Sequence, residues 1–181
     1  KNRWKSSTII STSIGQGEIL ATPIQIANLA ALIANKGYFY TPHIIKSIEG
    51  SEIDEKYRTK HVIDIKEKYF DVVQYGMELA VKKGTARFGQ IDSLVFCGKT
   101  GTAQNPHGED HSIFMGFAPK DKPQIAIAVY VENSGFGATW AVPIASLMIE
   151  KYLYREISPK RKHVEKRMME SVIDPNTDKK E

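Results

Sequence analysis

The chain has 181 residues, of which 41% are hydrophobic and 25% are charged, and its formal net charge is +4. This composition is typical of a soluble globular domain, or of a large piece of one. No apolar run approaches the roughly 20 residues that cross a bilayer, and no basic face with interleaved aromatic residues indicates nucleic-acid binding. A single cysteine, Cys97, excludes an internal disulfide bond.

The first half of the chain predicts two helices. Thr22-Pro23 supplies an N-cap hydroxyl and a proline at the first helical position, and an almost polar-free run follows as far as Gly37. The β-branched run from Ile44 to Ile48 predicts a short strand. Apolar residues at helical spacing then predict a second helix from Lys66 to Lys83. Residues 1–13 show no clear period.

The second half predicts three strands and a covering helix. The strands span Leu94–Gln104, Ser112–Ala118 and Gln124–Glu132, and their short connections imply an antiparallel meander. A helix over Thr139–Tyr154 follows, with Pro143 tolerated in its first turn. Helices, then antiparallel strands, then a helix indicate an α+β fold. The two early helices carry more apolar surface than three strands cover.

The C-terminal end is polar and basic. We expect residues 1–157 to form the folded part and residues 158–181 to form a tail, in which Lys162–Val172 fits either one more helix or a loose chain. Weak attraction to an anionic surface is the alternative to a solvated role for the tail's cations. The cations that we interpret as a solvated run are Lys160, Arg161, Lys162, Lys166 and Arg167.

Two segments admit more than one interpretation. Cys97 lies in an apolar strand and is interpreted as a small buried residue, because a reactive thiol needs a base and an electropositive pocket. Farther along, His107 and His111 flank Glu109 and Asp110, a pattern that suggests a metal site. No further cluster of ligands is obvious, so we expect a solvated loop beside a substrate groove and no metal.

The motif with the clearest chemistry is Lys99-Thr100-Gly101-Thr102, inside the first predicted strand of the meander. A lysine places a positive charge beside a substrate carboxylate, and threonine hydroxyls donate hydrogen bonds to it. A glycine lets a substrate backbone lie against the strand edge, where a backbone N–H stabilises an oxyanion. The triplet Lys-Thr-Gly is one of three motifs shared by penicillin-binding proteins and serine β-lactamases.

In this context the chain resembles the C-terminal part of the transpeptidase domain of the penicillin-binding protein 2 family, whose members are class B, elongation-type enzymes. The resemblance covers about Ser13 to Tyr154. It is carried, in the family's order, by SIGQGEILATPIQIANLAALIANKG, GTARFGQ, CGKTGTAQ, FMGFAPKDKPQIAIAVYVEN and the helix that begins near WAVPIASL. It implies the transpeptidase fold of penicillin-binding proteins and serine β-lactamases, with an antiparallel sheet covered by helices.

The resemblance also implies roles for individual residues. Lys99 would bridge to a serine of a Ser-x-Asn motif and assist proton movement, and the Thr102 N–H would form half of an oxyanion hole. Thr100 and Thr102, with Gly101 and Gln104, would bind a D-Ala-D-Ala stem peptide or a β-lactam. The segment Gly84-Thr85-Ala86 matches a part of the family near the site and receives no role here.

The implied activity is peptidoglycan crosslinking through an acyl-serine intermediate, without a cofactor. Neither Ser-x-x-Lys, which carries the nucleophile, nor Ser-x-Asn occurs in the 181 residues. We therefore expect both motifs to precede Lys1 in a longer enzyme, and we expect this chain alone to be inactive. Further implied features are partners in the wall-elongation complex, a location on the periplasmic side of the inner membrane, and membrane attachment only through an anchor outside this chain.

Two alternatives stay open at this point. A D,D-carboxypeptidase or a β-lactam sensor shares the fold, and a nucleophile-free interaction module would keep the motif without the chemistry. The segment between SIGQG and GTAR favours the class B transpeptidases. Unpaired strand edges and apolar helix faces also lead us to expect self-association of this chain.

Overall fold

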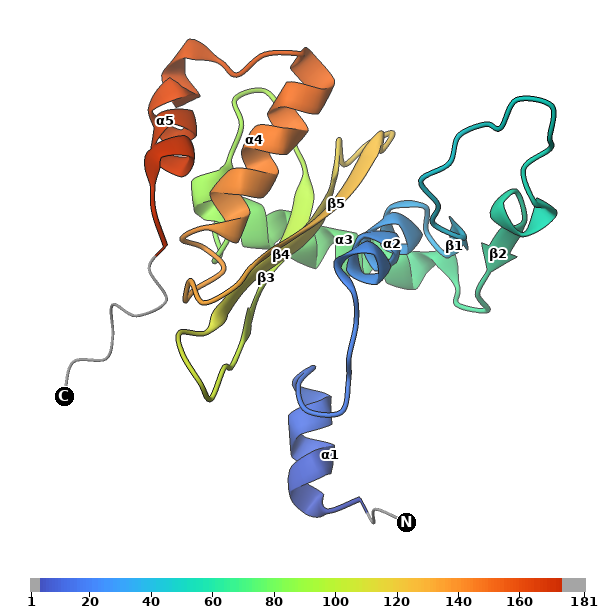
Figure 1. The fold of residues 1–181 in the computed structure, drawn as a ribbon, viewed down its shortest axis with the longest axis horizontal. Coiled ribbons are helices and arrows are strands. Elements are labelled where there is room, and N and C mark those ends of the chain that lie inside the picture. The colour runs from blue at the N-terminus through green and yellow to red at the C-terminus, as the bar shows by residue number, and fades with distance from the viewer. Residues whose placement is uncertain (1–3, 174–181) are drawn as a thin grey trace.

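The computed structural model describes residues 4–173, and its centre is a three-stranded antiparallel sheet. The strands β3 (Cys97–Ala103), β4 (His111–Ala118) and β5 (Ile125–Val131) lie in the order β3-β4-β5. Figure 1 shows helices on both sides of this sheet. The α+β architecture and the predicted meander are therefore confirmed.

The two faces of the sheet pack against different helices. Helix α4 (Ala141–Tyr154) covers one face, and α2 (Pro23–Ala34) and α3 (Glu67–Lys82) cover the other. This division follows from the alternation of side chains along a strand. The core on the α4 side contains Val81, Ala86, Ile91, Phe96, Phe114, Ala118, Ile127, Ala141, Val142, Ala145 and Ile149. The smaller core on the other side contains Ala34, Met77, Cys97 and Phe117.

Helix α2 begins where the sequence predicts. The Thr22 backbone N–H donates to the Gln25 side chain at 2.8 Å in a capping box, and Pro23 occupies the first turn. The helix ends at Ala34, and the chain turns away at Gly37, whose φ of +113° is costly for any residue with a side chain. A capped start and a glycine end explain why this helix is readable from the sequence alone.

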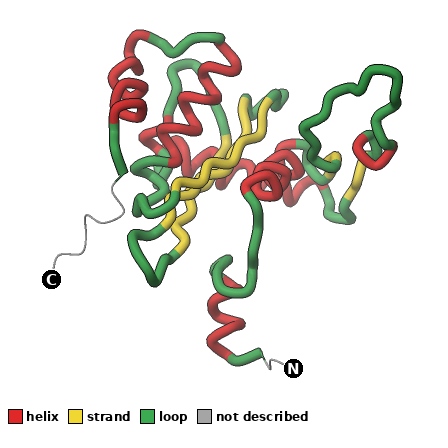
Figure 2. Tube along the Cα trace, in the orientation of Figure 1, coloured by secondary structure: helices red, strands yellow, loops and turns green. Residues whose placement is uncertain are grey.

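The region between α2 and α3 differs from the prediction. The strand expected at Ile44–Ile48 is wrong: this run lies in a loop apart from an isolated bridge to Ser51, and Ile44 is 99% exposed. Instead β1 (Tyr38–Tyr40) pairs antiparallel with β2 (Lys60–Val62). The intervening stretch is mainly loop in Figure 2. A β-branched run becomes a strand only where a partner lies in register, and here the partner pairs with Tyr38–Tyr40.

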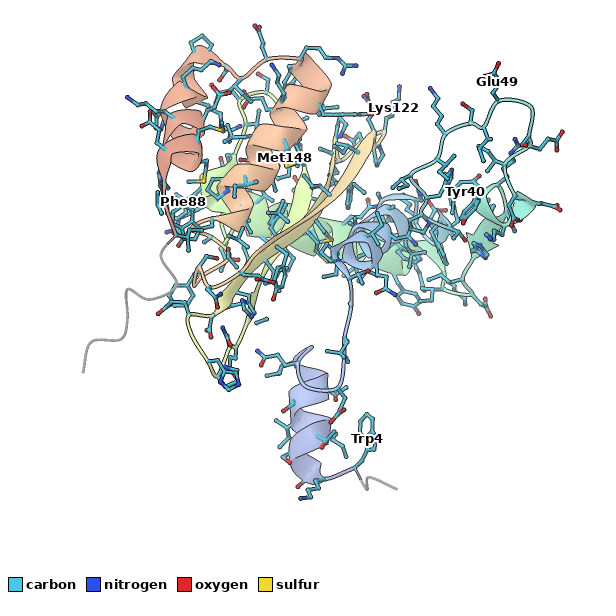
Figure 3. All side chains as sticks on the ribbon, viewed as in Figure 1. Trp4, Tyr40, Glu49, Phe88, Lys122 and Met148 are labelled. Carbon is cyan, nitrogen blue, oxygen red and sulfur yellow. The ribbon has the colours of Figure 1, made fainter. Side chains whose placement is uncertain are left out.

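The N-terminal segment forms a helix that the sequence pattern did not predict. Helix α1 (Ser6–Ser13) has no buried residue, and Figure 1 shows it standing apart from the sheet. Trp4, just before it, is 63% exposed and lies beside α1, away from the sheet, in Figure 3. Within residues 4–173, none of the helices combines the length and apolarity needed to cross a bilayer.

The basic C-terminal segment is ordered as a short 3-10 helix, η3 (Pro159–Arg161), followed by α5 (Lys162–Glu170). The solvated interpretation is wrong for Arg161, which is only 9% exposed. Its Nη1 lies 2.5 Å from Oε2 of Glu150, and its Nη2 donates to the Ser146 hydroxyl at 2.6 Å. A buried carboxylate on α4 therefore binds this cation, because a buried charge needs a partner. The proposed boundary at residue 157 stays a prediction.

Candidate active site

The Lys-Thr-Gly motif lies in the middle of β3, as predicted. One edge of β3 pairs with β4, with Lys99 opposite Met115 and Thr102 opposite Ser112. Its other edge has no strand partner within residues 4–173. A free edge presents unpaired backbone N–H and C=O groups, so it is able to bind an extended peptide as an added strand.

Lys99 is exposed to solvent on this strand. Its Nζ donates to the carbonyl oxygen of its neighbour Thr100 at 2.9 Å. No carboxylate forms an ion pair with Lys99 within residues 4–173. A cation with a long, flexible side chain and without an acidic partner is available to an anionic ligand.

Thr100 is joined to a second threonine from a distant part of the chain. The Oγ1 atoms of Thr85 and Thr100 lie 2.7 Å apart, within hydrogen-bond distance. Gly84 makes this approach possible, since a Cβ there would lie 2.8 Å from the Cα of Ala80. On the other side of Thr85, Ala86 is fully buried. Thr85 is thus held between a glycine at which any Cβ would clash with the backbone of α3 and a residue fixed in the core.

Sequence reasoning assigned no role to Thr85, although it noted the segment Gly84-Thr85-Ala86. The signal was a glycine–threonine pair directly after a predicted helix end. The contact with Thr100 joins positions 15 residues apart in sequence, so no local pattern could reveal it. The structure adds Thr85 to the candidate site.

The remaining predicted residues are spread along the end of β3. Thr102 is half-buried, and its carbonyl oxygen accepts a hydrogen bond from Nε2 of Gln16 at 3.4 Å. Gly101 packs against Ile113, because a Cβ at Gly101 would lie 3.3 Å from the Ile113 Cβ. Gln104 lies just beyond the strand and is exposed. Lys99, Thr100 and Thr102 therefore all lie on β3, where Thr100 and Thr102 share one face of the strand, and Gln104 lies beyond its end.

The loop between β3 and β4 is tied to the loop after β5. Asn105 Nδ2 donates to Asn133 Oδ1 at 2.6 Å, and the Asn105 N–H donates to Asp110 Oδ1 at 3.2 Å. His111 Nδ1 accepts from the Asn133 N–H at 3.1 Å, and its ring packs on Tyr130. Among residues 4–173, no three His, Cys, Asp or Glu side chains gather as metal ligands. The Asp110 carboxylate and the His111 ring are therefore part of a structural hydrogen-bond network.

Cys97 lies two residues before Lys99 but belongs to the core. It is fully buried, and its thiol donates to the carbonyl oxygen of Gln74 at 3.3 Å. Burial raises the pKa of the Cys97 thiol to about 12, so at neutral pH it is protonated and a poor nucleophile. The prediction of a small buried residue is confirmed.

The arrangement provides binding groups for an anionic peptide end. Thr85, Thr100 and Thr102 offer hydroxyl donors, Lys99 offers a positive charge, and the free edge of β3 offers backbone N–H groups. Hydrogen bonds from such donors to a carboxylate are charge-assisted and therefore strong. An acyl-transfer reaction also needs a nucleophile activated by a base. The sequence motif that would carry such a nucleophile, Ser-x-x-Lys, is absent from the 181 residues.

Comparison with known proteins gives consistent matches. The family model described as the penicillin binding protein transpeptidase domain matches residues 1–150. The peptidoglycan D,D-transpeptidase MrdA of Acinetobacter baumannii is 31% identical over 204 aligned positions, which cover 97% of this chain and 29% of that protein. The chain therefore spans less than a third of this curated relative.

Solved structures agree in fold. PBP2 of Pseudomonas aeruginosa in complex with WCK 5153 aligns with a TM-score of 0.74 and 36% identity, covering 88% of this chain and 36% of that one. PBP2 of Helicobacter pylori in complex with MreC aligns with a TM-score of 0.68 and 26% identity, covering 83% and 28%. Both matches place most of this chain within about a third of a longer protein.

Proposed function

Since this chain belongs to the penicillin-binding protein transpeptidase domain family, we propose that it supplies the Lys-Thr-Gly strand of a peptidoglycan D,D-transpeptidase. The complete enzyme would crosslink stem peptides through an acyl-serine intermediate. The nucleophilic serine would come from residues of the longer protein, because no Ser-x-x-Lys occurs in the 181 residues.

The proposed roles are those that the family resemblance implies, and the geometry of β3 supports them. Thr100 and Thr102 hydrogen-bond the terminal carboxylate of a D-Ala-D-Ala peptide or the carboxylate of a β-lactam, and Thr85 orients the Thr100 hydroxyl. Gly101 leaves the strand edge open to the substrate backbone, and Gln104 contacts the substrate beyond the end of β3. These groups position the scissile carbonyl.

The chemistry then divides into two acyl transfers. The serine oxygen attacks the carbonyl carbon of the penultimate D-alanine, and the peptide bond breaks with release of D-alanine. An acceptor amine next attacks the acyl ester, which restores the serine. The Thr102 N–H donates to the oxyanion of each tetrahedral intermediate, while Lys99 bridges to the serine of a Ser-x-Asn motif and assists proton movement. No cofactor takes part.

The observation that carries this proposal is the 2.7 Å contact between Thr85 and Thr100 on a strand whose other edge is free. It places two hydroxyls side by side next to Lys99 in sequence, on the strand that carries its positive charge. Two neighbouring hydroxyls can both donate to one carboxylate, whose oxygens accept several hydrogen bonds.

Partners and location are proposed for the complete protein. The Helicobacter pylori relative forms a complex with MreC, so we propose that the complete protein works with proteins of the wall-elongation complex. Its substrate lies outside the cytoplasm, which places the domain on the periplasmic side of the inner membrane. A segment outside this chain would anchor it there.

The test is covalent labelling with a fluorescent penicillin. The full-length protein should be labelled stoichiometrically, and Lys99→Ala should lower the acylation rate by roughly a hundredfold, the scale of lost proton-transfer assistance. The exposed Lys46→Ala in the 41–57 loop is the matched control and should behave as wild type. This chain alone should take no label, because no acyl-enzyme forms without the nucleophile.

Two results would contradict the proposal. Labelling of this chain alone would show that its own residues react with penicillin. Near-normal acylation of Lys99→Ala, at an unchanged melting temperature, would remove Lys99 from the mechanism.

A further inference from the structure

The loop between β5 and α4 packs against β3 at the candidate site. A Cβ on Gly137 would lie 2.6 Å from the carbonyl oxygens of Gly101 and Ile113, and 3.3 Å from the Cβ of Thr100. The loop backbone is therefore packed directly on β3 at its Thr100–Gly101 peptide. Any displacement of this loop changes the support of the strand that carries the proposed carboxylate site.

The inner side of the loop is fastened to β4 by one buried hydroxyl. Ser112 is fully buried, donates to the carbonyl oxygen of Phe136 at 3.1 Å and accepts from the N–H of Ala141 at 3.0 Å. The N–H of Val142 also donates to the carbonyl oxygen of Gly137 at 3.0 Å. These bonds hold both ends of the loop segment 136–141, and within it the Thr139 N–H donates to the carbonyl oxygen of Phe136 at 2.9 Å.

The outer support comes from α5. Nη2 of Arg167 donates to the carbonyl oxygen of Thr139 at 3.3 Å, and its guanidinium carbon lies 5.7 Å from the ring centroid of Trp140. A guanidinium at that distance over an indole is attracted to it. Within residues 4–173, no ion pair to a carboxylate competes for Arg167.

Helix α5 is itself held in place. Its preceding turn is anchored by Arg161, which is buried against Glu150 and Ser146 of α4. The N–H of Ser158 donates to the same Glu150 carboxylate at 3.1 Å. Figure 1 shows α5 lying alongside α4, on the sheet face opposite α2. The position of Arg167 is thus set by a buried anchor, Arg161, which lies six residues earlier in the chain.

A hollow lies between α5, the loop before α4 and the segment that follows Thr85. It has a volume of about 370 Å³ and is lined by Phe88, which follows Thr85 in sequence, by Thr139 and Pro143, and by His163 and Arg167 of α5. Phe88 lies near the end of α5 in Figure 3. The hollow is therefore bounded by Phe88, by the loop before α4 together with the first turn of α4, and by α5.

We propose that Arg167 is a positioning residue for the acyl-transfer site: through Thr139 and Trp140 it holds loop 136–140 against Thr100 and Gly101. The proposal rests on the proposed function for its effect on acylation. It goes beyond the family match, which ends at residue 150, and gives the basic C-terminal segment a task at the site.

The experiment compares three variants of the full-length protein. Arg167→Gln removes the guanidinium, Arg167→Lys keeps the charge without the planar donor, and Lys166→Gln makes the same charge change at the neighbouring exposed position. Two quantities are measured: the acylation rate with a fluorescent penicillin, and amide hydrogen exchange in peptides covering residues 134–142. Melting temperatures check that the variants fold.

Arg167→Gln should speed exchange over residues 134–142 and slow acylation by roughly two- to tenfold, the size of one net hydrogen bond. Arg167→Lys should recover part of both effects, and Lys166→Gln should match wild type. Should Arg167→Gln fail to fold, the comparison of Arg167→Lys with Lys166→Gln carries the same test.

Unchanged exchange in Arg167→Gln would overturn the support of the loop. Faster exchange with wild-type acylation would overturn its importance for the site. A wild-type protein that takes no label would instead overturn the proposed function, and the exchange measurement would still decide whether Arg167 holds the loop.

Discussion

At the C-terminal end of the molecule a charged side chain is buried, whereas at the N-terminal end large apolar side chains are exposed. Arg161 is 9% exposed, because Glu150 and Ser146 satisfy its guanidinium inside the fold. Leu20 is 91% exposed and Ile14 is 68% exposed. The comparison teaches that burial in this chain follows the presence of a partner more closely than the polarity of the residue.

We expect the C-terminal and N-terminal regions to differ also in how much they contribute to the stability of the fold. Residues 94–161 contribute the strands, α4 and the anchor of α5, and they enclose most of the larger core. Residues 4–20 contribute α1 and a turn without one buried residue. We expect the first region to respond strongly to substitution and the second to respond weakly. The predictions below are ordered by the size of that response.

The largest effect should come from breaking the buried pair. Arg161→Met leaves the Glu150 carboxylate buried without its cation, which costs about 3–5 kcal/mol in comparable cases. The melting temperature of this chain should fall accordingly. The double variant Arg161→Met with Glu150→Leu removes both charges and should recover most of the loss. If Arg161→Met alone were as stable as wild type, this region would tolerate an unpaired buried charge. The expected difference in stability response between residues 94–161 and residues 4–20 would then be wrong.

A smaller, pH-dependent effect should come from Glu78 on α3. Hydrogen bonds from Lys120, at 2.5 Å, and from Lys82 lower the pKa of the Glu78 carboxyl. A lowered folded-state pKa stabilises the fold above the unfolded value of 4.5, and this stabilisation is lost as the pH falls through the folded value.

The measurement is the free energy of unfolding of this chain between neutral pH and acid. Glu78→Gln removes the titrating group, so its stability should depend less on pH in the acid range than that of wild type. Exposed Glu49→Gln in the 41–57 loop is the matched control and should leave the slope unchanged. Identical acid slopes for wild type and Glu78→Gln would contradict the assignment.

The smallest effect on stability should come from the exposed N-terminal residues. The double variant Ile14→Ser, Leu20→Ser should change the free energy of unfolding by no more than about 0.5 kcal/mol, as is usual for surface positions. The same change should reduce self-association of this chain, which we still expect from its apolar surface and free strand edges. Light scattering over a concentration series measures this. A marked loss of stability would show that the N-terminal region packs like the core.

Much of the fold was predictable where local signals agreed. Thr22-Pro23 and Gly37 define both ends of α2, and the three strands have short connections and β-branched residues that leave few alternative pairings. The motif at Lys99 was readable because three chemically specific residue types stand together inside one of these strands. Cys97 was correctly placed in the core for the same reason, since its neighbours are apolar.

The rest depends on contacts between distant parts of the chain. The run at Ile44–Ile48 has strand composition, but β2 pairs with Tyr38–Tyr40 instead. The approach of Thr85 to Thr100 depends on how α3 ends against β3. The burial of Arg161 depends on a carboxylate 11 residues away on another helix. Composition cannot supply such pairings, because each requires the tertiary arrangement to exist first.

The contact between Arg161 and Glu150 also shows that the family-model match and the packed structure end at different residues. The match to the family model ends at residue 150, inside α4, so a boundary taken from that model would fall at the very residue whose carboxylate needs a cation. The packed structure continues farther, because Glu150 binds the Ser158 N–H and the Arg161 guanidinium. Expression vectors and domain-swap chimeras should therefore take their junction after α5. A gene segment trimmed to residues 1–150 would encode a protein in which the Glu150 carboxylate lacks its cation.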